Sequence, residues 1–411
     1  MASCAMEPDA EHIDPLDVSR SDLYRDDGWQ EPFRRLRAEA PVHRVQRSGF
    51  GPYWSISTYR PIVEVESLPE LFSSETNGFT IASVIDAEVR LPMFIGRDRP
   101  VHTAQRRTVA PAFTPSEMAR LAADLRHRTA EVLDGLPWDG RFDWVERVSI
   151  ELTTQMLAIL FDFPWHDRAK LTHWSDWMGD IEIVKNPALR QQRLDKIYEC
   201  GGYFARLWAG RAAAPPAPDL ISMMAHSDAM RAMDANEFMG NLMLLIVGGN
   251  DTTRNTMSGL IHALHLHPGE RARIEADAAL IPNAASEIIR WQTPLAHMAR
   301  TATQDVELAG QRIAAGDKVV LWYVSANRDE SVFGADADAF RADRPNARRH
   351  LAFGHGIHRC VGARLAELQV TILLEEMRAR RMRAHVTGAP ERVAACFVHG
   401  YRKLPVELER Y

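Results

Sequence analysis

Cysteine is scarce in this chain, and its few cysteines are far apart. Among 411 residues the cysteines are Cys4, Cys200, Cys360 and Cys396, and none belongs to a Cys-x-x-Cys pair. A structural zinc site therefore has no basis in the sequence, because such sites use closely spaced pairs of thiolates. Few, unpatterned cysteines instead predict a protein of the reducing cytoplasm.

Long apolar runs and an excess of positive charge are also lacking. No stretch reaches the roughly 18 uninterrupted apolar residues that a membrane-spanning helix needs. The first twelve residues are acidic and have no apolar centre, which predicts neither a signal peptide nor a membrane anchor. A net charge of −6 argues against nucleic acid as a partner. The 46% hydrophobic composition is that of a soluble globular protein with enough length to bury a cofactor.

Residues 351–365 concentrate unusual features around one sulfur atom. Cys360 is bracketed by Gly354, Gly356 and Gly362. Glycine has no Cβ, so it lets the backbone turn tightly and approach a flat ligand. After Gly362 leucines recur near the helical period, and we expect Cys360 in a tight loop at the N-terminal end of a helix. The peptide N–H groups and the dipole of that helix predict a lowered thiol pKa and a thiolate that is a metal ligand or a nucleophile.

The residues leave two interpretations of this cysteine open, and a resemblance adds a third. A nucleophile would need a base, and His355 and His358 are close enough in sequence to supply one. An ordinary buried cysteine is the plainest interpretation. The string from Phe353 to Gly362, however, resembles the haem-binding loop of the cytochromes P450, whose pattern is Phe-Gly-x-Gly-x-x-x-Cys-x-Gly. The resemblance implies haem b with the Cys360 thiolate on its iron and with Phe353 and Gly362 beside it.

A second motif lies in the middle of a long predicted helix. Residues 234–237, Asp-Ala-Asn-Glu, have the pattern of a capping box, and the helix that they open can continue to His267, where a Pro-Gly pair follows. A helix of about 30 residues would be roughly 45 Å long. Gly248 and Gly249 lie inside it, at a cost of about 1 kcal/mol each relative to alanine. Either a close helix crossing or a flat ligand against the bare backbone explains them.

Asp251 and Thr252 follow these glycines and offer an acid and a hydroxyl. The segment resembles the small-Gly-x-acid-Thr motif in the long central helix of the cytochromes P450, which covers the oxygen-binding face of the haem. The resemblance implies that Gly248 contacts the haem and the substrate, and that Asp251 and Thr252 relay protons when O2 is activated.

His102 and Arg106 lie four residues apart, so they share one face of a helix that Pro100 can begin. Two donors side by side suit an anionic ligand, although a solvated helix face is the commoner reason for such a pair. In the cytochromes P450 a His-x-x-x-Arg helix start binds the haem propionates. Arg300 and His358 match the other donors to the propionates, and the resemblance assigns all four residues to cofactor binding.

Glu287 and Arg290 are three residues apart on one predicted helix face. Such a pair alone indicates no more than a surface ion pair. In the cytochromes P450 this Glu-x-x-Arg pair is buried and contacts an arginine before the cysteine loop, for which Arg341 and Arg344 are the candidates. The resemblance therefore implies a structural role.

The predicted fold is mainly α with small β-sheets, an α+β arrangement. Helix is predicted for residues 30–40 and for most of 115–214, and strands are predicted for residues 41–45, 53–57, 294–300, 306–308 and 318–324. Residues 72–90 show no steady period and are predicted to form a long functional loop. The resemblance extends from about Trp29 to Leu408, and it implies the cytochrome P450 fold with a long central helix over a buried haem. Residues 1–28 are predicted to be an acidic, irregular arm and 29–411 a single haem domain.

Several strings resemble one branch of the family, the soluble bacterial alkane terminal hydroxylases, among them residues 50–54, 246–255 and 321–330. The resemblance implies a monooxygenase that inserts one oxygen of O2 into an unactivated C–H bond, by terminal hydroxylation of medium-chain alkanes or fatty acids. It also implies the positions that line the substrate pocket: Ile81, Val84, Ile85, Leu244, Leu245, Val247, Gly248, Leu295, Ala296, Met298, Phe397 and Val398.

The chain has no room for a flavin or iron–sulfur module beside a haem domain, so electrons are expected from a ferredoxin and a ferredoxin reductase. Arginines cluster around the cysteine in sequence: Arg348, Arg349, Arg359 and Arg364. A basic face there would suit an acidic ferredoxin, and a merely solvated face is an equal alternative.

Three other functions compete with this one. A peroxygenase of the same fold would use hydrogen peroxide and would not need Asp251 and Thr252. A haem-binding gas sensor or carrier would perform no turnover. A third alternative keeps the enzyme but gives it a terpene or steroid substrate.

Overall fold

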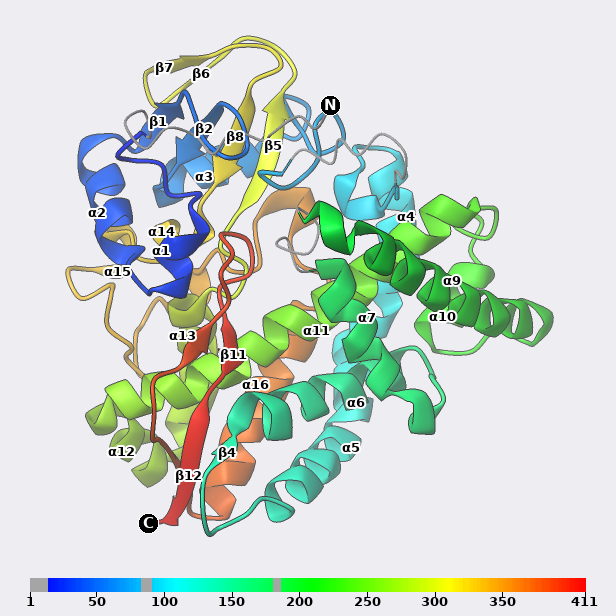
Figure 1. The fold of residues 1–411 in the computed structure, drawn as a ribbon, viewed down its shortest axis with the longest axis vertical. Helices are drawn as coiled ribbons and strands as arrows, with labels where there is room; N and C mark the ends of the chain where they lie inside the picture. Colours follow the sequence, from blue (N-terminus) through cyan, green and yellow to red (C-terminus); the bar gives the residue numbers. More distant parts are fainter. Residues whose placement is uncertain (1–13, 83–90, 180–185) are drawn as a thin grey trace.

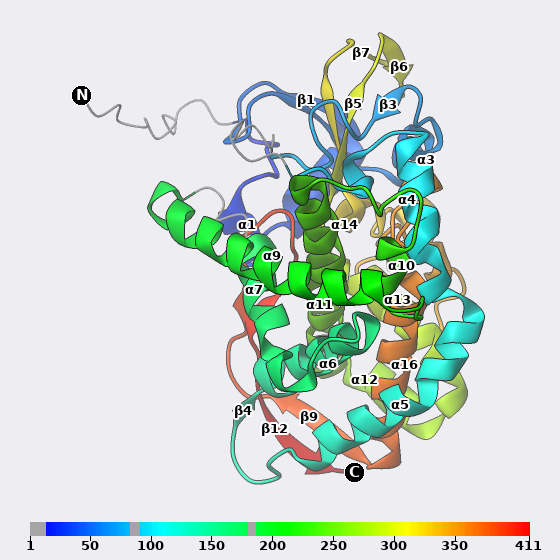
Figure 2. The same ribbon diagram turned by 90° about the vertical axis from the view of Figure 1, so that its right-hand side faces the viewer.

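The computed structural model describes residues 14–82, 91–179 and 186–411. Figures 1 and 2 show the largest sheet at one end of the molecule, with the longest helix, α11 (Ala235–Leu266), crossing the middle beneath it. None of the helices in these ranges is long and apolar enough to cross a membrane. The other helices are α1 (Ser21–Arg25), α2 (Gln30–Glu39), α3 (Tyr59–Ser67), α4 (Val101–Val109), α5 (Pro115–Asp134), α6 (Glu151–Leu160), α7 (Ala169–Gly179), α9 (Arg190–Ala213), α10 (Leu220–Ala225), α12 (Pro268–Ala276), α13 (Ile281–Gln292), α14 (Tyr323–Ala326), α15 (Glu330–Phe333) and α16 (Ala363–Ala379).

The strands form small sheets, and the largest has the order β1-β2-β8-β5-β3. In it β2 and β8 are parallel and the other pairs are antiparallel. A second sheet has the order β4-β12-β9, and β6–β7 and β10–β11 are two-stranded. The strands are β1 (Val42–Val45), β2 (Tyr53–Ile56), β3 (Phe72–Ser73), β4 (Phe142–Asp143), β5 (Met298–Ala302), β6 (Val306–Leu308), β7 (Gln311–Ile313), β8 (Lys318–Leu321), β9 (Met382–Val386), β10 (Glu391–Arg392), β11 (Tyr401–Lys403) and β12 (Pro405–Arg410).

Helix α11 begins where the capping pattern predicts. The Asp234 carboxylate accepts hydrogen bonds from the backbone N–H groups of Asn236 and Glu237, both at 2.9 Å. In a full capping box the Glu237 carboxylate would also accept a hydrogen bond from the Asp234 N–H. In the described structure it accepts one from the Gln105 side chain instead, at 2.7 Å. That bond joins the start of α11 to α4, the helix that carries His102 and Arg106.

The prediction of an irregular N-terminal arm for residues 1–28 is wrong over residues 21–25, which are helical. Helix α1 lies within this segment, and Val18 and Tyr24 are buried with Trp29 in a core cluster. The Tyr24 hydroxyl donates a hydrogen bond to the Val18 carbonyl at 3.1 Å. Acidic composition suggested an unstructured arm, but a few large apolar side chains are enough to anchor a short segment to a core.

Two predicted strands differ in extent from the structure. The segment expected to be extended from residue 318 to 324 leaves the sheet after Leu321 and turns into α14, whose residues are buried. A buried apolar run looks the same in strand and helix, so its period cannot separate them. The segment 294–300 joins the sheet only from Met298, and before it Leu295 forms an isolated bridge with Val398.

Candidate functional site

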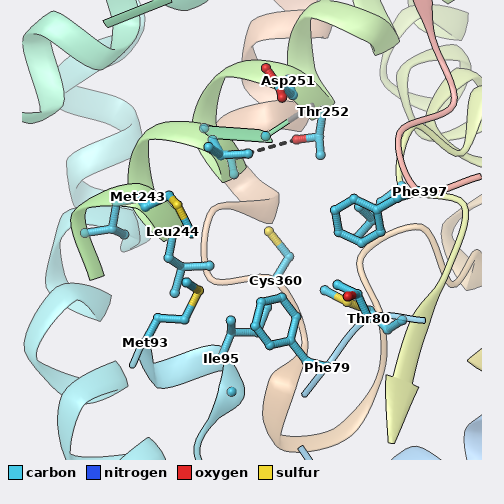
Figure 3. Close-up of a pocket in the computed structure, with 18 of the residues that line it drawn as sticks. Phe79, Thr80, Met93, Ile95, Met243, Leu244, Asp251, Thr252, Cys360 and Phe397 are labelled. Carbon is cyan, nitrogen blue, oxygen red and sulfur yellow. Dashed lines mark hydrogen bonds between the residues drawn. The ribbon is translucent and has the colours of Figure 1, made fainter. Parts of the chain in front are cut away.

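A cavity of about 1080 Å³ lies beside the middle of α11. Figure 3 shows the Cys360 sulfur pointing into it, with Thr252 on the α11 side and Phe79, Leu244 and Phe397 around it. Segments far apart in the sequence therefore meet at this one sulfur atom. Every residue that the sequence assigned to catalysis or cofactor binding lines the cavity: His102, Arg106, Gly248, Asp251, Thr252, Arg300, Phe353, His358, Cys360 and Gly362.

The cysteine loop turns tightly, as its glycines require. Gly354 and Gly356 have φ angles of 67° and 62°, a region that glycine enters without steric cost. The Cys360 N–H donates a hydrogen bond to the Phe353 carbonyl at 2.7 Å, which closes the loop. Helix α16 begins at Ala363, so Cys360 does lie just before a helix N-terminus.

The direction of the Cys360 pKa differs from the expectation. Although the sulfur is open to the cavity, the surrounding protein removes it from water, and this burial raises the pKa of the thiol. The backbone N–H of Gly362 and the charges of Arg106 and Arg359 lower it, but they do not outweigh burial. A thiolate at this position needs a bound cation, since a coordinating thiol is deprotonated outright.

His102 and His358 lie together at the cavity, with ring centroids 4.2 Å apart. Burial, aided by nearby arginines, lowers the pKa of His102 to about 4 and that of His358 to about 2. Among the described residues, neither ring nitrogen of His102 and not the Nδ1 of His358 has a hydrogen-bond partner. Buried polar atoms are nearly always paired, so these nitrogens fit a ligand that brings its own oxygen atoms.

Arg106 and Arg300 add two guanidinium groups to the same cavity. Arg106 donates a hydrogen bond to the Arg359 carbonyl of the cysteine loop, and Arg300 bonds the Ala299 carbonyl at 2.7 Å. A guanidinium has five N–H donors, so both side chains keep donors for an anion. The donor set of these arginines and the two histidines fits the propionates of the expected haem, and the Cys360 sulfur fits its iron.

The two glycines of α11 have different explanations, and both alternatives raised by the sequence apply. A Cβ on Gly249 would lie 2.8 Å from a methyl carbon of Leu157, so this glycine permits a close crossing with α6. A Cβ on Gly248 would have no atom within 4 Å among the described residues, and Gly248 lines the cavity. Gly248 thus presents bare backbone to whatever the cavity holds.

Thr252 and Asp251 face different surroundings. The Thr252 hydroxyl donates a hydrogen bond to the Gly248 carbonyl at 3.0 Å, above the Cys360 sulfur (Figure 3). The Asp251 side chain points away from the cavity centre toward α7, where the Ser175 hydroxyl donates to its Oδ1 at 3.1 Å. Arg254 lies 3.2 Å from the same oxygen and 2.8 Å from the half-exposed carboxylate of Asp176.

The apolar wall of the cavity overlaps only partly with its prediction. Two expected residues, Ile81 and Ala296, are fully buried in the core cluster around Trp322 and do not line the cavity. A loop that edges a cavity turns some apolar side chains into the core, and composition cannot say which. Val84 and Ile85 lie outside the described residues. The expected residues that do line it are Leu244, Leu245, Val247, Gly248, Leu295, Met298, Phe397 and Val398.

The sequence analysis missed the wall residues Phe79, Thr80, Met93, Ile95 and Met243, which Figure 3 shows around the sulfur. Met93 and Ile95 stand in an apolar run directly before the His102 helix, and this nearness was the available signal. Phe79 follows a glycine in a loop without periodicity, so no sequence pattern pointed to it.

Glu287 and Arg290 are completely buried and form an ion pair at 2.7 Å. Of the two candidate partners, Arg344 is the one whose side chain reaches Glu287, at 2.9 Å. Arg341 offers only its backbone N–H, while its side chain pairs with Asp336 near the surface. This cluster fixes the segment before the cysteine loop against α13.

The residues 217–377 match the family model described as Cytochrome P450. Over 96% of its length the chain is 35% identical to a putative cytochrome P450 126 of Mycobacterium tuberculosis, of which it covers 97%. The chain belongs to the cytochrome P450 family. As a cytochrome P450 it is a monooxygenase, an oxidoreductase that uses haem b with a cysteine thiolate as axial ligand, together with substrate, O2 and redox partners.

Other relatives of this cytochrome P450 differ in their named substrates. Linalool 8-monooxygenase of Pseudomonas putida is 34% identical over 95% of this chain and 98% of its own. Two solved structures are more similar: a cytochrome P450-153 from Novosphingobium aromaticivorans, 60% identical with TM-score 0.92, and CYP153D17 from Sphingomonas sp. PAMC 26605, 69% identical with TM-score 0.93. They cover 96% and 97% of this chain and 100% of their own.

Proposed function

We propose that this cytochrome P450 hydroxylates the terminal carbon of medium-chain alkanes or fatty acids, with electrons from a ferredoxin and its reductase. The observation that carries the proposal is an apolar cavity that closes around the Cys360 sulfur. The likeness to the bacterial alkane terminal hydroxylases in several strings supports it, as does 32% identity to a methyl-branched lipid omega-hydroxylase of Mycobacterium tuberculosis.

The cavity wall favours a flexible hydrocarbon chain held by shape. Around the sulfur stand the rings of Phe79 and Phe397 and the side chains of Met93, Met243 and Leu244. A terminal C–H bond is stronger than an internal one, so terminal attack requires that the methyl group be held nearest the reacting centre. The apolar side chains around the sulfur would do this by excluding the bent poses that bring internal carbons forward.

In this proposal Cys360 holds the iron, Phe353 and Gly362 lie beside it, and the bare backbone of Gly248 faces the cofactor. Arg106 and Arg300 would neutralise the two propionates and His102 and His358 would donate hydrogen bonds to them, because such anions are costly to bury unpaired. When bound, the haem supplies the activation of O2 and the transfer of one of its oxygen atoms into a C–H bond.

Protons reach the cavity through Asp251 and Thr252 in this proposal. The contacts of Asp251 place it near solvent, because its partner Arg254 also contacts the half-exposed carboxylate of Asp176; the guanidinium stays protonated and only positions Asp251. Asp251 must turn from Ser175 toward the cavity to pass its proton on, because it now faces α7. Thr252 then exchanges its bond to the Gly248 carbonyl for one into the cavity and delivers the proton there.

The cysteine loop offers a basic surface for an acidic ferredoxin. Arg348, Arg349, Arg359 and Arg364 are exposed around it, and Arg107 of α4 is exposed as well. Complementary charge raises the rate at which such partners meet. A cytoplasmic location stays a prediction from the scarce cysteines.

The test is a titration of the ferric protein with octane and with dodecanoic acid, followed by product analysis with a ferredoxin system. We expect the low-spin to high-spin shift with these lipids, and 1-octanol or the omega-hydroxy acid as product. Relatives named for linalool and for a steroid make a terpene or a steroid the second candidate substrate. A shift with linalool or testosterone and none with either lipid would favour that second substrate class.

A further inference from the structure

Glu66 is a buried carboxylate that no motif pointed to. It lies in the last turn of α3, its side chain is 1% exposed, and it does not line the cavity. Its Oε1 accepts hydrogen bonds from Arg300 at 3.2 Å and from the Tyr323 hydroxyl at 2.6 Å. Its Oε2 accepts a hydrogen bond from the backbone N–H of His355 at 2.8 Å. One side chain thus joins β5, α14 and the cysteine loop.

Two glycines of the cysteine loop are explained by this residue. A Cβ on Gly356 would lie 2.1 Å from the Glu66 backbone oxygen, far closer than two non-bonded atoms can approach. A Cβ on Gly354 would lie 3.3 Å from the Tyr323 hydroxyl and 3.5 Å from the Glu66 Oε1. The loop therefore rests directly on the end of α3.

Burying the Glu66 carboxylate at this position is energetically unfavourable. Burial raises the pKa of Glu66, and Arg300, Tyr323 and the His355 N–H only partly offset that effect. Replacing a buried ion pair by apolar side chains is often neutral or stabilising. Stability alone therefore does not account for a charge between the cysteine loop and Arg300, which faces the cavity.

We infer that Glu66 is a positioning residue that holds the Arg300 guanidinium and the cysteine loop in one hydrogen-bonded cluster, and that its charge lowers the reduction potential of the haem. The inference rests on the proposed function, because it takes Cys360 and Arg300 as residues that hold the cofactor. One nitrogen of the Arg300 guanidinium donates a hydrogen bond to the Ala299 carbonyl and another donates one to Glu66. These two bonds fix the plane of the guanidinium and therefore the direction of its remaining donors. A buried negative charge nearby opposes the arrival of an electron.

One variant removes this charge, and a second removes a donor that stabilises it. Glu66→Gln keeps the size of the side chain and removes the charge, and Tyr323→Phe removes a hydrogen bond that favours the charged form of Glu66. We expect the midpoint potential of the haem to rise in Glu66→Gln, by about tenfold in the equilibrium constant for reduction, or 59 mV for one electron. In Tyr323→Phe, where Arg300 and the His355 N–H still hold the carboxylate, we expect a smaller rise.

Glu66→Asp and Glu70→Gln complete the set. The aspartate keeps the charge but is one methylene shorter, so its potential should stay nearer to wild type than that of Glu66→Gln. A greater share of its ferrous–CO form should absorb at the position of lost thiolate ligation, because its reach to the loop is shorter. Glu70 follows α3 and is 69% exposed, and Glu70→Gln should match wild type in both measurements.

The potentiometric titration decides between outcomes. A rise in Glu66→Gln with a smaller rise in Tyr323→Phe supports the inference. A wild-type or lower potential in a Glu66→Gln protein that folds with haem overturns it, as does a fall in Tyr323→Phe. Failure of the proposed function is distinguishable, because it shows in the wild-type protein as a ferrous–CO spectrum without the thiolate band.

Discussion

The cysteine side of the cavity and its apolar wall enclose the same space but are held by different forces. On the cysteine side, buried charges make short directional bonds, as Glu287 does with Arg290 and Arg344 and as Glu66 does with the loop. The wall consists of side chains such as Phe79, Leu244 and Phe397, in contacts that have no direction. A charged network fails when one member is lost, whereas an apolar wall can be reshaped.

The largest expected effect is the loss of one arginine from the buried network. Arg344→Ala removes one of the two buried guanidinium groups that contact Glu287, the other being Arg290, and breaking such a buried pair costs about 3–5 kcal/mol. Arg341→Ala is the matched control, because its side chain is 42% exposed and pairs at the surface, where a bond contributes at most about 1 kcal/mol. Urea unfolding measures both. Equal losses would contradict the distinction between a buried network and its surroundings.

The next effect concerns the hydroxyl on α11. Thr252→Ala removes the group placed to deliver a proton, and product formed per electron should fall roughly hundredfold, the lower end of acid–base contributions. Thr252→Ser keeps the hydroxyl and should stay near wild type. Hydrogen peroxide without electron donors should drive the alanine variant and wild type equally, because that route needs no relay. Unchanged coupling in Thr252→Ala would remove the assigned role.

Substitution of a residue of the apolar wall should weaken substrate binding and barely change protein stability. Phe397→Ala widens the cavity, and the affinity for octane should weaken by about tenfold, as expected when a pocket loses apolar contact. The control is Phe161→Ala, which empties a fully buried core site and should cost about 3–5 kcal/mol of stability. Its octane affinity should be unchanged. The reverse pattern, a core loss at Phe397 and a binding loss at Phe161, would refute the assignment of the wall.

The smallest expected effect is a pH dependence of protein stability that arises from Lys318, a residue that contacts the backbone of the cavity wall. The Lys318 ammonium donates to the carbonyls of Thr80 and Ile81, and burial lowers its pKa from the usual 10.5 to about 8. Between those values the unfolded chain binds more protons than the folded one, so stability from this residue rises as pH increases from about 8. The free energy of unfolding of wild type minus that of Lys318→Met should therefore increase as the pH rises above 8.

Exposed Lys403 provides the control for this measurement, since its side chain is 68% exposed. The difference between wild type and Lys403→Met should not change with pH over the same range. A flat difference for Lys318→Met as well would mean that the buried lysine is not the source of the dependence.

The same contrast decides what the sequence could predict. Directional bonds demand particular residues at fixed spacing, so the cysteine loop, the α11 motif and the Glu287–Arg290 pair were all recognisable. Apolar contacts accept many residues, so Ile81 was assigned to the wall although it lies in the core. The role of Glu66 could not be predicted, because a glutamate near the end of a short helix looks like an ordinary surface residue in the sequence. Only the fold brings the cysteine loop into contact with it.

The account depends most on the Cys360 thiolate as the ligand of the haem iron. The direct measurement is the absorption spectrum of the dithionite-reduced protein under carbon monoxide, for wild type and for Cys360→Ala. We predict a Soret band at the long-wavelength position of thiolate-ligated haem in wild type, and its loss in the variant. A wild-type band at the position of histidine-ligated haem would contradict the account.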